Sequence, residues 1–346
     1  MRKSLLALLL VAAGGLSLSG TALAEVQLKQ GHPERYTVVK GDTLWDISGK
    51  FLSQPWKWPE LWHANPQIEN PHLIYPGDTL SLVYIDGQPR LVLNRGESRG
   101  TIKLSPQVRS TPMAEAIPTI PLEAINSFLL SNRIVDTPED FAGQPYVVAG
   151  NAERVVSGAG DRIYARGDFS REDAAYGIFR QGKTYTDPET KEFLGINADD
   201  IGSGELVAEE GDIATLSLTR TTQEVRLGDR LFPTEERAVN STFVPSEPAT
   251  DVNGVILDVP RGVNRIGQFD VVTISKGKID GLSEGNVLAV YKTGETVRDR
   301  ITGESVKIPD ERAGLLMVFR AYEKLSYGLV LYATRDLALL DKVKNP

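Results

Sequence analysis

The stretch YTVVKGDTLWDIS, Tyr36–Ser48, has the pattern of a short strand, a tight turn and the start of a helix. Residues 36–39 are rich in strand-forming side chains, and Gly41 follows in the turn. Thr43 is placed to cap a helix, because its hydroxyl can accept a hydrogen bond from a free N–H of the first turn. The apolar face of the predicted helix follows at i, i+3 and i+7 spacing: Leu44, Ile47 and Phe51.

A second helix and a second strand complete this unit. Pro59 suits the first turn of a helix, and the pair Asn65-Pro66 ends it. A loop rich in proline and asparagine then leads to a short strand over residues 79–83. The sequence therefore predicts the order strand, helix, helix, strand, with a stiff loop that fixes the surface between the two strands.

The motifs YTVVKGDTLWDIS and NPQIENPHLIYPGDTLSL, in this order, resemble the LysM domain, a module that binds peptidoglycan and chitin. The resemblance covers Tyr36 to about Val83 and departs from the family in an insertion around Trp56 and Trp58. In the family, the sugar lies in a shallow groove between the loop after strand one and the loop before strand two. The resemblance thus implies a peptidoglycan site at Gly41, Asp42, Thr43, Leu44, Asn70, Leu73, Ile74, Tyr75 and Pro76.

Physical chemistry supports such a site, but each residue also has a structural interpretation. Backbone groups on stiff loops can pair with an N-acetyl amide, and Leu44 or Ile74 can cover its methyl group. Alternatively, Asp42 and Thr43 only start the helix, Gly41 only serves the turn, and Leu44 belongs to the core. An exposed tryptophan could stack on a sugar ring, although Trp45 and Trp62 are expected in packing.

The first residues have the features of an export signal. Arg2 and Lys3 precede the apolar run 5–12, and Ala22-Leu23-Ala24 matches an A-x-A cleavage site. We expect cleavage after residue 24; the alternative is an uncleaved anchor, for which the apolar run is short. No later segment is apolar enough to cross a bilayer. The expected location is the periplasm, at the cell wall and with no membrane span after cleavage.

Composition excludes several functions. The chain of 346 residues has no cysteine and a net charge of −8. Disulfides, a lipid anchor on cysteine and a thiol nucleophile are therefore excluded. An acidic chain without a basic stripe also argues against a nucleic-acid partner. The three histidines, His32, His63 and His72, lie in or beside the LysM-like segment, so the rest lacks the usual zinc ligands.

We therefore expect no metal, no cofactor and no catalytic activity. One pattern points the other way, because S-x-x-K at Ser275 and K-T-G at Lys292 echo the motifs of penicillin-binding proteins. In those proteins the serine starts a helix, whereas Ser275 lies at a predicted strand–turn junction, so we interpret the match as chance. The alternative that stays open is a LysM-targeted cell-wall enzyme or enzyme activator.

The remaining two-thirds contain an imperfect repeat. RIYARGDF resembles VTISKGKI, and TDPETKEFLG resembles RDRITGESVK. Both copies consist of short runs rich in Val, Ile, Leu and Tyr between glycine turns, which predicts two small, mostly antiparallel β-barrels or sandwiches. The stretch PLEAINSFLLSNRIV before the first copy, residues 121–135, is expected to be helical. Its apolar face is expected to pack on the next part of the chain: Leu122, Ile125, Phe128 and Leu129.

The predicted fold class is multidomain α+β, a βααβ LysM domain followed by two repeated β modules. The expected segments are a signal peptide (1–24), a LysM domain (34–84), a linker (85–120), a helix with the first β module (121–233), a linker (234–262) and the second β module (263–346).

The last module carries a second resemblance. GLSEGNVLAVY and KIPDERAGLLMVFRAYEKLSYGLVLYATRDL are similar to the C-terminal domain of the flagellar outer-ring protein FlgT. An exported chain with one LysM domain, a linker and this module resembles the TsaP family, which associates with the outer-membrane secretin of type IV pili. This resemblance implies a non-catalytic adaptor whose partners are peptidoglycan glycan chains and an outer-membrane secretin.

Overall fold

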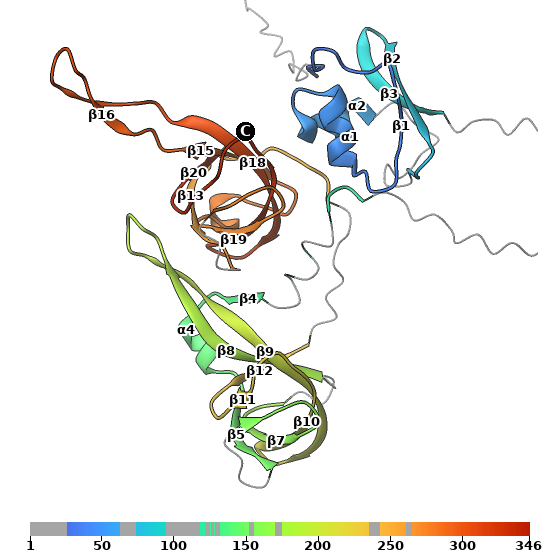
Figure 1. Cartoon of the computed structure of the whole chain (residues 1–346). Helices are drawn as coiled ribbons and strands as arrows, with labels where there is room; N and C mark the ends of the chain where they lie inside the picture. Colours follow the sequence, from blue (N-terminus) through green and yellow to red (C-terminus); the bar gives the residue numbers. More distant parts are fainter. Residues whose placement is uncertain are drawn as a thin grey trace, which may run out of the picture.

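The chain folds into an N-terminal α+β domain and two β modules (Figure 1). The computed structural model describes residues 26–62, 74–94, 118–121, 125, 128, 132–151, 156–169, 175–234, 243–260 and 265–346. The expected signal peptide lies outside these residues. Within the described parts of the chain, no helix has the length and apolar character needed to cross a membrane.

The N-terminal domain has the predicted βααβ order and one additional strand. Its sheet has the antiparallel order β1-β2-β3, and its helices supply the other half of an apolar core. The elements are β1 (Arg35–Thr37), α1 (Leu44–Phe51), the 3-10 helix η1 (Pro55–Lys57), α2 (Trp58–Trp62), β2 (Thr79–Ile85) and β3 (Gln88–Asn94).

Strand β3 lies inside the segment that we expected to be a linker, residues 85–120. It pairs with β2 from Ile85↔Gln88 to Thr79↔Asn94. The two residues between the strands, Asp86 and Gly87, both have positive φ, which is the backbone of a tight hairpin turn. The N-terminal domain therefore extends to residue 94.

The first β module is built on six strands that close on themselves. Its sheet order is β10-β7-β5-β12-β8-β9-β4. A further pairing of β10 with β9 closes the first six of these strands into a ring, and β4 pairs with β9 outside the ring. The elements are β4 (Asn132–Val135), α4 (Pro138–Ala142), β5 (Tyr146–Gly150), β6 (Val156–Ser157), β7 (Arg162–Arg166), β8 (Ala175–Thr186), β9 (Phe193–Glu210), β10 (Ile213–Thr221), β11 (Val225–Arg226) and β12 (Arg230–Pro233).

The second β module is a closed barrel with the order β13-β14-β19-β18-β15-β20. A separate two-stranded hairpin, β16–β17, extends from it. The elements are β13 (Asn253–Asp258), β14 (Val271–Ile274), the 3-10 helix η3 (Lys278–Asp280), β15 (Val287–Lys292), β16 (Thr296–Arg298), β17 (Ser305–Lys307), β18 (Glu311–Ala321), β19 (Ser326–Ala333) and β20 (Lys342–Lys344).

The two barrels have the same topology, which confirms the repeat predicted from the sequence. When the six ring strands of each module are numbered in chain order, both rings run 1-2-5-4-3-6. The neighbouring strands of both rings are antiparallel. The two modules are therefore copies of one fold.

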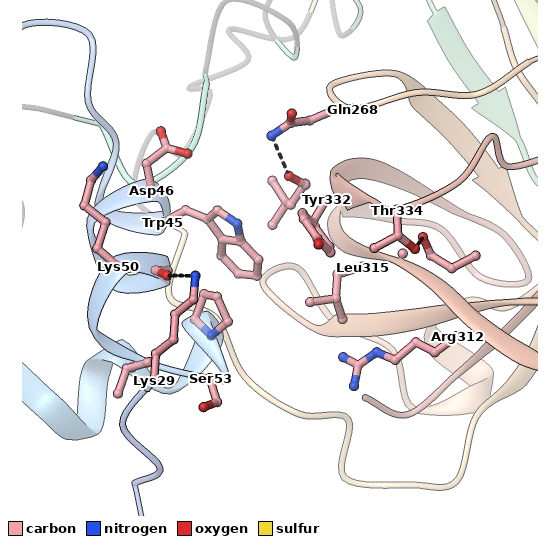
Figure 2. A pocket seen from close by; sticks show the side chains of 16 residues that line it. Lys29, Trp45, Asp46, Lys50, Ser53, Gln268, Arg312, Leu315, Tyr332 and Thr334 are labelled. Carbon is pink, nitrogen blue, oxygen red and sulfur yellow. Dashed lines mark hydrogen bonds between the residues drawn. The ribbon is translucent and has the colours of Figure 1, made fainter. Parts of the chain in front are cut away.

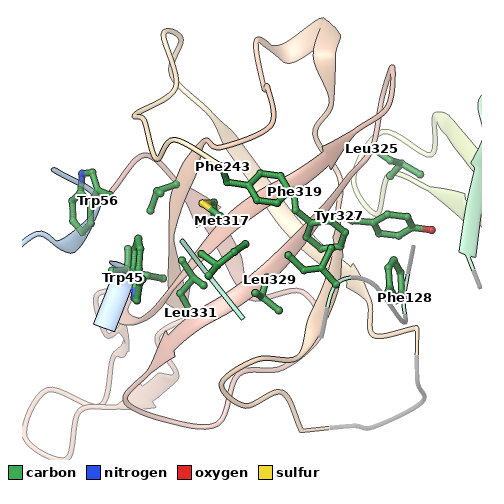
Figure 3. Packing of buried hydrophobic residues seen from close by; sticks show 14 of the residues in the cluster. Trp45, Trp56, Phe128, Phe243, Met317, Phe319, Leu325, Tyr327, Leu329 and Leu331 are labelled. Atoms are coloured by element: carbon green, nitrogen blue, oxygen red, sulfur yellow. The ribbon is translucent and has the colours of Figure 1, made fainter. Parts of the chain in front are cut away.

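Strand β18 is buried on both of its faces. Leu316 and Val318 point into the barrel core, whereas their neighbours Leu315, Met317 and Phe319 belong to a separate apolar cluster outside it. Alternation along a strand places successive side chains on opposite faces. The outer cluster is covered by residues of the N-terminal domain and of the segment after that domain (Figure 3): Trp45, Trp56, Ile120, Ile125 and Phe128.

This packing differs from the expectation for the helix before the first module. Ile125 and Phe128 are helical and fully buried, as the apolar face predicted, but they pack on the second barrel. Leu122 and Leu129 lie outside the described residues. Residues 132–135, which the periodicity placed in the same helix, form β4 and pair with β9.

Candidate functional site

The two loops expected to bind glycan lie side by side. The Val38 N–H donates to the Asp78 carbonyl at 2.8 Å, and the Gly77 N–H donates to the Val38 carbonyl at 2.8 Å. These bonds connect the end of the first strand to the loop before β2. Gly41 and Gly77 are both exposed, and no neighbouring atom lies within 4 Å of where a side chain would begin. An extended ligand could thus approach the backbone of both loops.

The Asp42 carboxylate holds the first loop together. Its Oδ2 accepts the Val39 N–H at 2.8 Å and the Tyr36 hydroxyl at 2.8 Å. Burial first, and then the hydrogen bond to this carboxylate, raise the pKa of Tyr36 to about 12. The role of Asp42 in this structure is therefore to shape the loop.

This hydrogen bond predicts a pH dependence of domain stability. The folded pKa of Tyr36 lies above its ordinary value of 10.0, so the stabilisation is complete below pH 10.0 and is lost as the pH rises toward about 12. All four tryptophans lie at positions 45, 56, 58 and 62, so urea unfolding followed by tryptophan fluorescence reports on this domain. Tyr36→Phe should abolish this loss of stability at alkaline pH. It should also lower the free energy of unfolding by about 0.5–1.5 kcal/mol at neutral pH.

Tyr84→Phe is the matched control, because Tyr84 is 63% exposed on β2. An alkaline loss of stability that is equal in the Tyr36→Phe variant and the native chain would contradict the role given to this hydroxyl.

Thr43 is the helix cap that the sequence predicted. Its hydroxyl oxygen accepts the Asp46 N–H at 3.1 Å, and the Asp46 carboxylate accepts the Thr43 hydroxyl at 2.7 Å and the Thr43 N–H at 3.3 Å. This is a reciprocal capping box. Thr43 is buried, so its side chain serves the start of α1.

The structure places the remaining predicted residues in three different ways. Leu44 and Ile74 are core residues of the N-terminal domain, with 3% and 0% of their surface exposed, so their side chains do not face the groove. Tyr75 and Pro76 are half-buried at the second loop. The other two predicted residues, Asn70 and Leu73, lie outside the described residues.

Residues 118–119, which lie in the expected linker 85–120, cover the start of α1. The Leu44 N–H donates to the Pro118 carbonyl at 3.0 Å, and the Trp45 N–H donates to the Thr119 carbonyl at 3.1 Å. These are N–H groups of the first helical turn, which have no partner inside the helix. In this arrangement they are not available to a glycan, which leaves the exposed glycine turns as the open part of the site.

All four tryptophans are buried, so none is an exposed stacking platform. Trp58 and Trp62 belong to the core of the N-terminal domain, whereas Trp45 and Trp56 pack against the second barrel. The Trp56 indole N–H donates to Glu247 at 3.2 Å, and the Arg312 guanidinium lies 5.6 Å from its ring centre. In the inserted segment, Trp58 therefore serves the domain core and Trp56 attaches the domain to the barrel.

A cleft of about 600 Å³ lies between α1 and the second barrel (Figure 2). Its apolar floor includes Trp45 and Leu315, and its rim carries Lys50 and Arg312 from opposite sides. Tyr332, 52% exposed, adds an aromatic ring from β19. Because two domains form this cleft, a local sequence motif could not have predicted it.

Ser275 of the S-x-x-K pattern and Lys292 of the K-T-G pattern both make hydrogen bonds to the backbone. The Ser275 hydroxyl is buried at the end of β14 and accepts the Val255 N–H at 2.9 Å. The Lys292 ammonium donates to the Asp336 carbonyl at 2.8 Å. Among the described residues, no three His, Cys, Asp or Glu side chains gather as a metal site requires. His63 and His72 lie outside those residues.

Comparison with known proteins assigns the N-terminal domain. The LysM domain model matches residues 36–83. An uncharacterized protein of Bacillus subtilis (strain 168), YqbP, is 42% identical over 60 residues, which cover 14% of this chain and 27% of that relative. The chain therefore spans about a quarter of this relative's length. Residues 36–83 form a LysM domain, a module for binding the cell wall that is not catalytic, and the domain indicates peptidoglycan binding.

Proposed function

We propose that this protein is a non-catalytic periplasmic adaptor that holds an outer-membrane secretin to the cell wall. The observation that carries the proposal is the LysM domain, whose two loops are joined through Val38 and present the exposed glycines Gly41 and Gly77. A glycan chain lies across these two turns. Stiff loops lose little entropy when they bind, which favours affinity.

The proposed site differs in detail from the one inferred by resemblance. The backbone at Gly41 and Gly77 and the half-buried side chains of Tyr75 and Pro76 contact the sugar, while Asp42 and Thr43 keep the first loop in shape. Asn70 and Leu73 remain proposed ligands on the strength of the family pattern.

The attachment of the LysM domain to the second β module supports the adaptor role. Trp45 and Trp56 are buried against that barrel. A load applied to the barrel therefore reaches the wall-binding domain through packed side chains. The β modules are the proposed contact for the secretin, and the chain is exported by its signal peptide.

Co-sedimentation of the full mature chain with purified peptidoglycan sacculi tests the wall contact. We expect the native chain to pellet and a chain lacking residues 34–84 to stay in solution. Tyr75→Ala should weaken binding about tenfold, which corresponds to about 1.4 kcal/mol. Tyr84→Ala, at an exposed position on β2, is the matched control and should bind like the native chain. A deletion variant that still pellets would overturn the proposal.

The same samples separate the adaptor from the alternative, a LysM-targeted enzyme or enzyme activator. We expect soluble muropeptides at the background level after prolonged incubation. Release of muropeptides that disappears in a Ser275→Ala, Lys278→Ala double variant would establish the S-x-x-K motif as an active site. Release that persists in this variant would indicate an enzyme with a different site.

The partner is tested by affinity capture of the secretin from detergent-solubilised outer membranes. We expect the tagged full chain to retain the secretin both before and after the Tyr75→Ala substitution, because the two contacts lie on different domains. Failure of the full chain to retain it would show that the adaptor serves another envelope machine.

A further inference from the structure

The two β modules carry matching hairpin arms. In the first module, β8 and β9 continue beyond the barrel into a turn that contains Asp187 and Thr190. The Asp187 carboxylate accepts the N–H groups of Glu189 and Thr190, and the Asp187 N–H donates to the Glu192 carbonyl at 2.8 Å. We call this hairpin, residues 181–195, the first arm.

The second module repeats this turn. The Asp299 carboxylate accepts the Ile301 N–H at 2.7 Å, and the Asp299 N–H donates to the Glu304 carbonyl at 2.8 Å. Lys191 and Gly303 occupy equivalent positions in the two turns, and both have positive φ. We call this hairpin, residues 296–307 with β16 and β17, the second arm. The two arms are therefore equivalent parts of the repeated fold.

The first arm docks on the next β module. The Lys183 ammonium and the Tyr185 hydroxyl both donate hydrogen bonds to the carboxylate of Asp258 on β13, at 2.7 and 2.8 Å. Glu192 pairs with Lys324, which lies in the turn between β18 and β19. Leu194 joins the apolar cluster on the outer face of the second barrel. Within one chain, the arm of one module thus holds the barrel of the following module.

The second arm projects into solvent (Figure 1). Every residue of β16 and β17 is exposed, and Ile301 at the turn is 95% exposed. A two-stranded hairpin is at best marginally stable alone in water, and exposed apolar side chains on it mark an interaction surface. Its exposed cations, Arg298, Arg300 and Lys307, outnumber its two acidic residues, Asp299 and Glu304, so the arm carries a small positive excess.

The matching acceptor lies on the first β module. The turn between β9 and β10 is the counterpart of the turn between β18 and β19 that the first arm contacts. This β9–β10 turn is exposed and carries Glu210 at the end of β9, followed by Asp212, whose carboxylate pairs with Arg166 of β7 at 2.7 Å. The two carboxylates outnumber this one cation, and Val207 is 54% exposed nearby. The charge of this turn is complementary to the cationic second arm.

We propose that the second arm docks on the β9–β10 turn of a second copy of this chain. The contact repeats between chains what the first arm does within one chain. Because donor and acceptor are different surfaces, the contact is head to tail and leads to a closed ring or an open filament. This inference is independent of glycan binding and of the secretin.

Site-specific crosslinking tests this contact directly, because the native chain has no cysteine. Glu304→Cys and Glu210→Cys are made in separate full-length chains, mixed, and treated with a short bismaleimide. We expect at least about tenfold more crosslinked heterodimer than from Glu304→Cys mixed with Glu189→Cys, an exposed glutamate on the first arm. Equal yields from the two mixtures would overturn the proposal.

Sedimentation velocity supplies a measurement that needs no cysteine. The native chain should associate as its concentration rises, and the association should weaken in high salt. The double variant Arg298→Glu, Arg300→Glu should lower the association constant about tenfold or more, because it places like charges opposite the acidic turn. Ile279→Asp, at a 64% exposed site on η3, should leave association unchanged. A native chain that is monomeric at every concentration would refute the contact.

Discussion

Replacing Phe128 with alanine is expected to lower the free energy of unfolding of the second β module by about 3–5 kcal/mol. The Phe128 ring is 1% exposed and meets two aromatic rings edge-on, Tyr327 at 4.6 Å and Phe319 at 5.9 Å between centres. Both partners face outward from the barrel. Alanine would leave a cavity between the helical segment and the strands, and its walls would lose these contacts.

The measurement is thermal unfolding followed by far-UV circular dichroism, together with hydrogen exchange of β18 and β19. Phe169→Ala is the matched control, since Phe169 is 5% exposed and meets Tyr176 edge-on at 5.3 Å inside the first module. We expect the control to destabilise the first module and to leave exchange in β18 and β19 unchanged. The packing of Phe128 on the second barrel would be contradicted if Phe128→Ala changed exchange only in the first module.

The structural features that were predicted best from the sequence are those that depend on residues close together in the chain. The Thr43 cap, the apolar face of α1 and the order of the LysM elements all arise from residues a few positions apart. The reciprocal bonds from Thr43 to Asp46 were not predicted. The repeat was also predictable, because two copies of one fold keep similar strands and turns. The common ring order of the two barrels follows from that similarity.

Two strands were assigned to linkers. Strand β13 (Asn253–Asp258) lies in the expected linker 234–262 although it belongs to the second barrel, so that module begins before residue 263. The other strand is β3, whose signal was present. Asp86-Gly87 stands between two runs of alternating apolar residues, which is a strong hairpin signal. The LysM resemblance stops near Val83, so β3 was assigned to the linker. A family pattern defines the shared part of a domain and leaves strands added by one chain to be found from local turn chemistry.

Side-chain direction and long-range packing could not be predicted. The family pattern placed Leu44 and Ile74 in the binding loops, but it does not show that both side chains turn into the core. The periodicity predicted that Phe128 is buried, but it did not predict which surface covers it. Its partners, Phe319 and Tyr327, lie far away in the sequence, and only the folded chain brings them together.

Trp45→Ala is expected to release the LysM domain from the second barrel, at a cost of about 3–5 kcal/mol. Trp45 is 5% exposed and lies in the apolar cluster that includes Leu315 and Leu331. Its backbone N–H is already bonded to the Thr119 carbonyl, so the helix keeps its start when the indole is removed. The loss should therefore fall mainly on the contact between the domains.

Hydroxyl-radical footprinting measures this release, because Leu315 and Leu331 are 6% and 1% exposed in the docked state. Both should become reactive in Trp45→Ala. Trp58→Ala removes a tryptophan of similar burial from the core of the LysM domain, so it should destabilise that domain and leave both leucines protected. Protection of both leucines in the Trp45→Ala variant would mean that other contacts hold the domain. In that case Trp56, through its bond to Glu247 and its contact with Arg312, would carry the attachment.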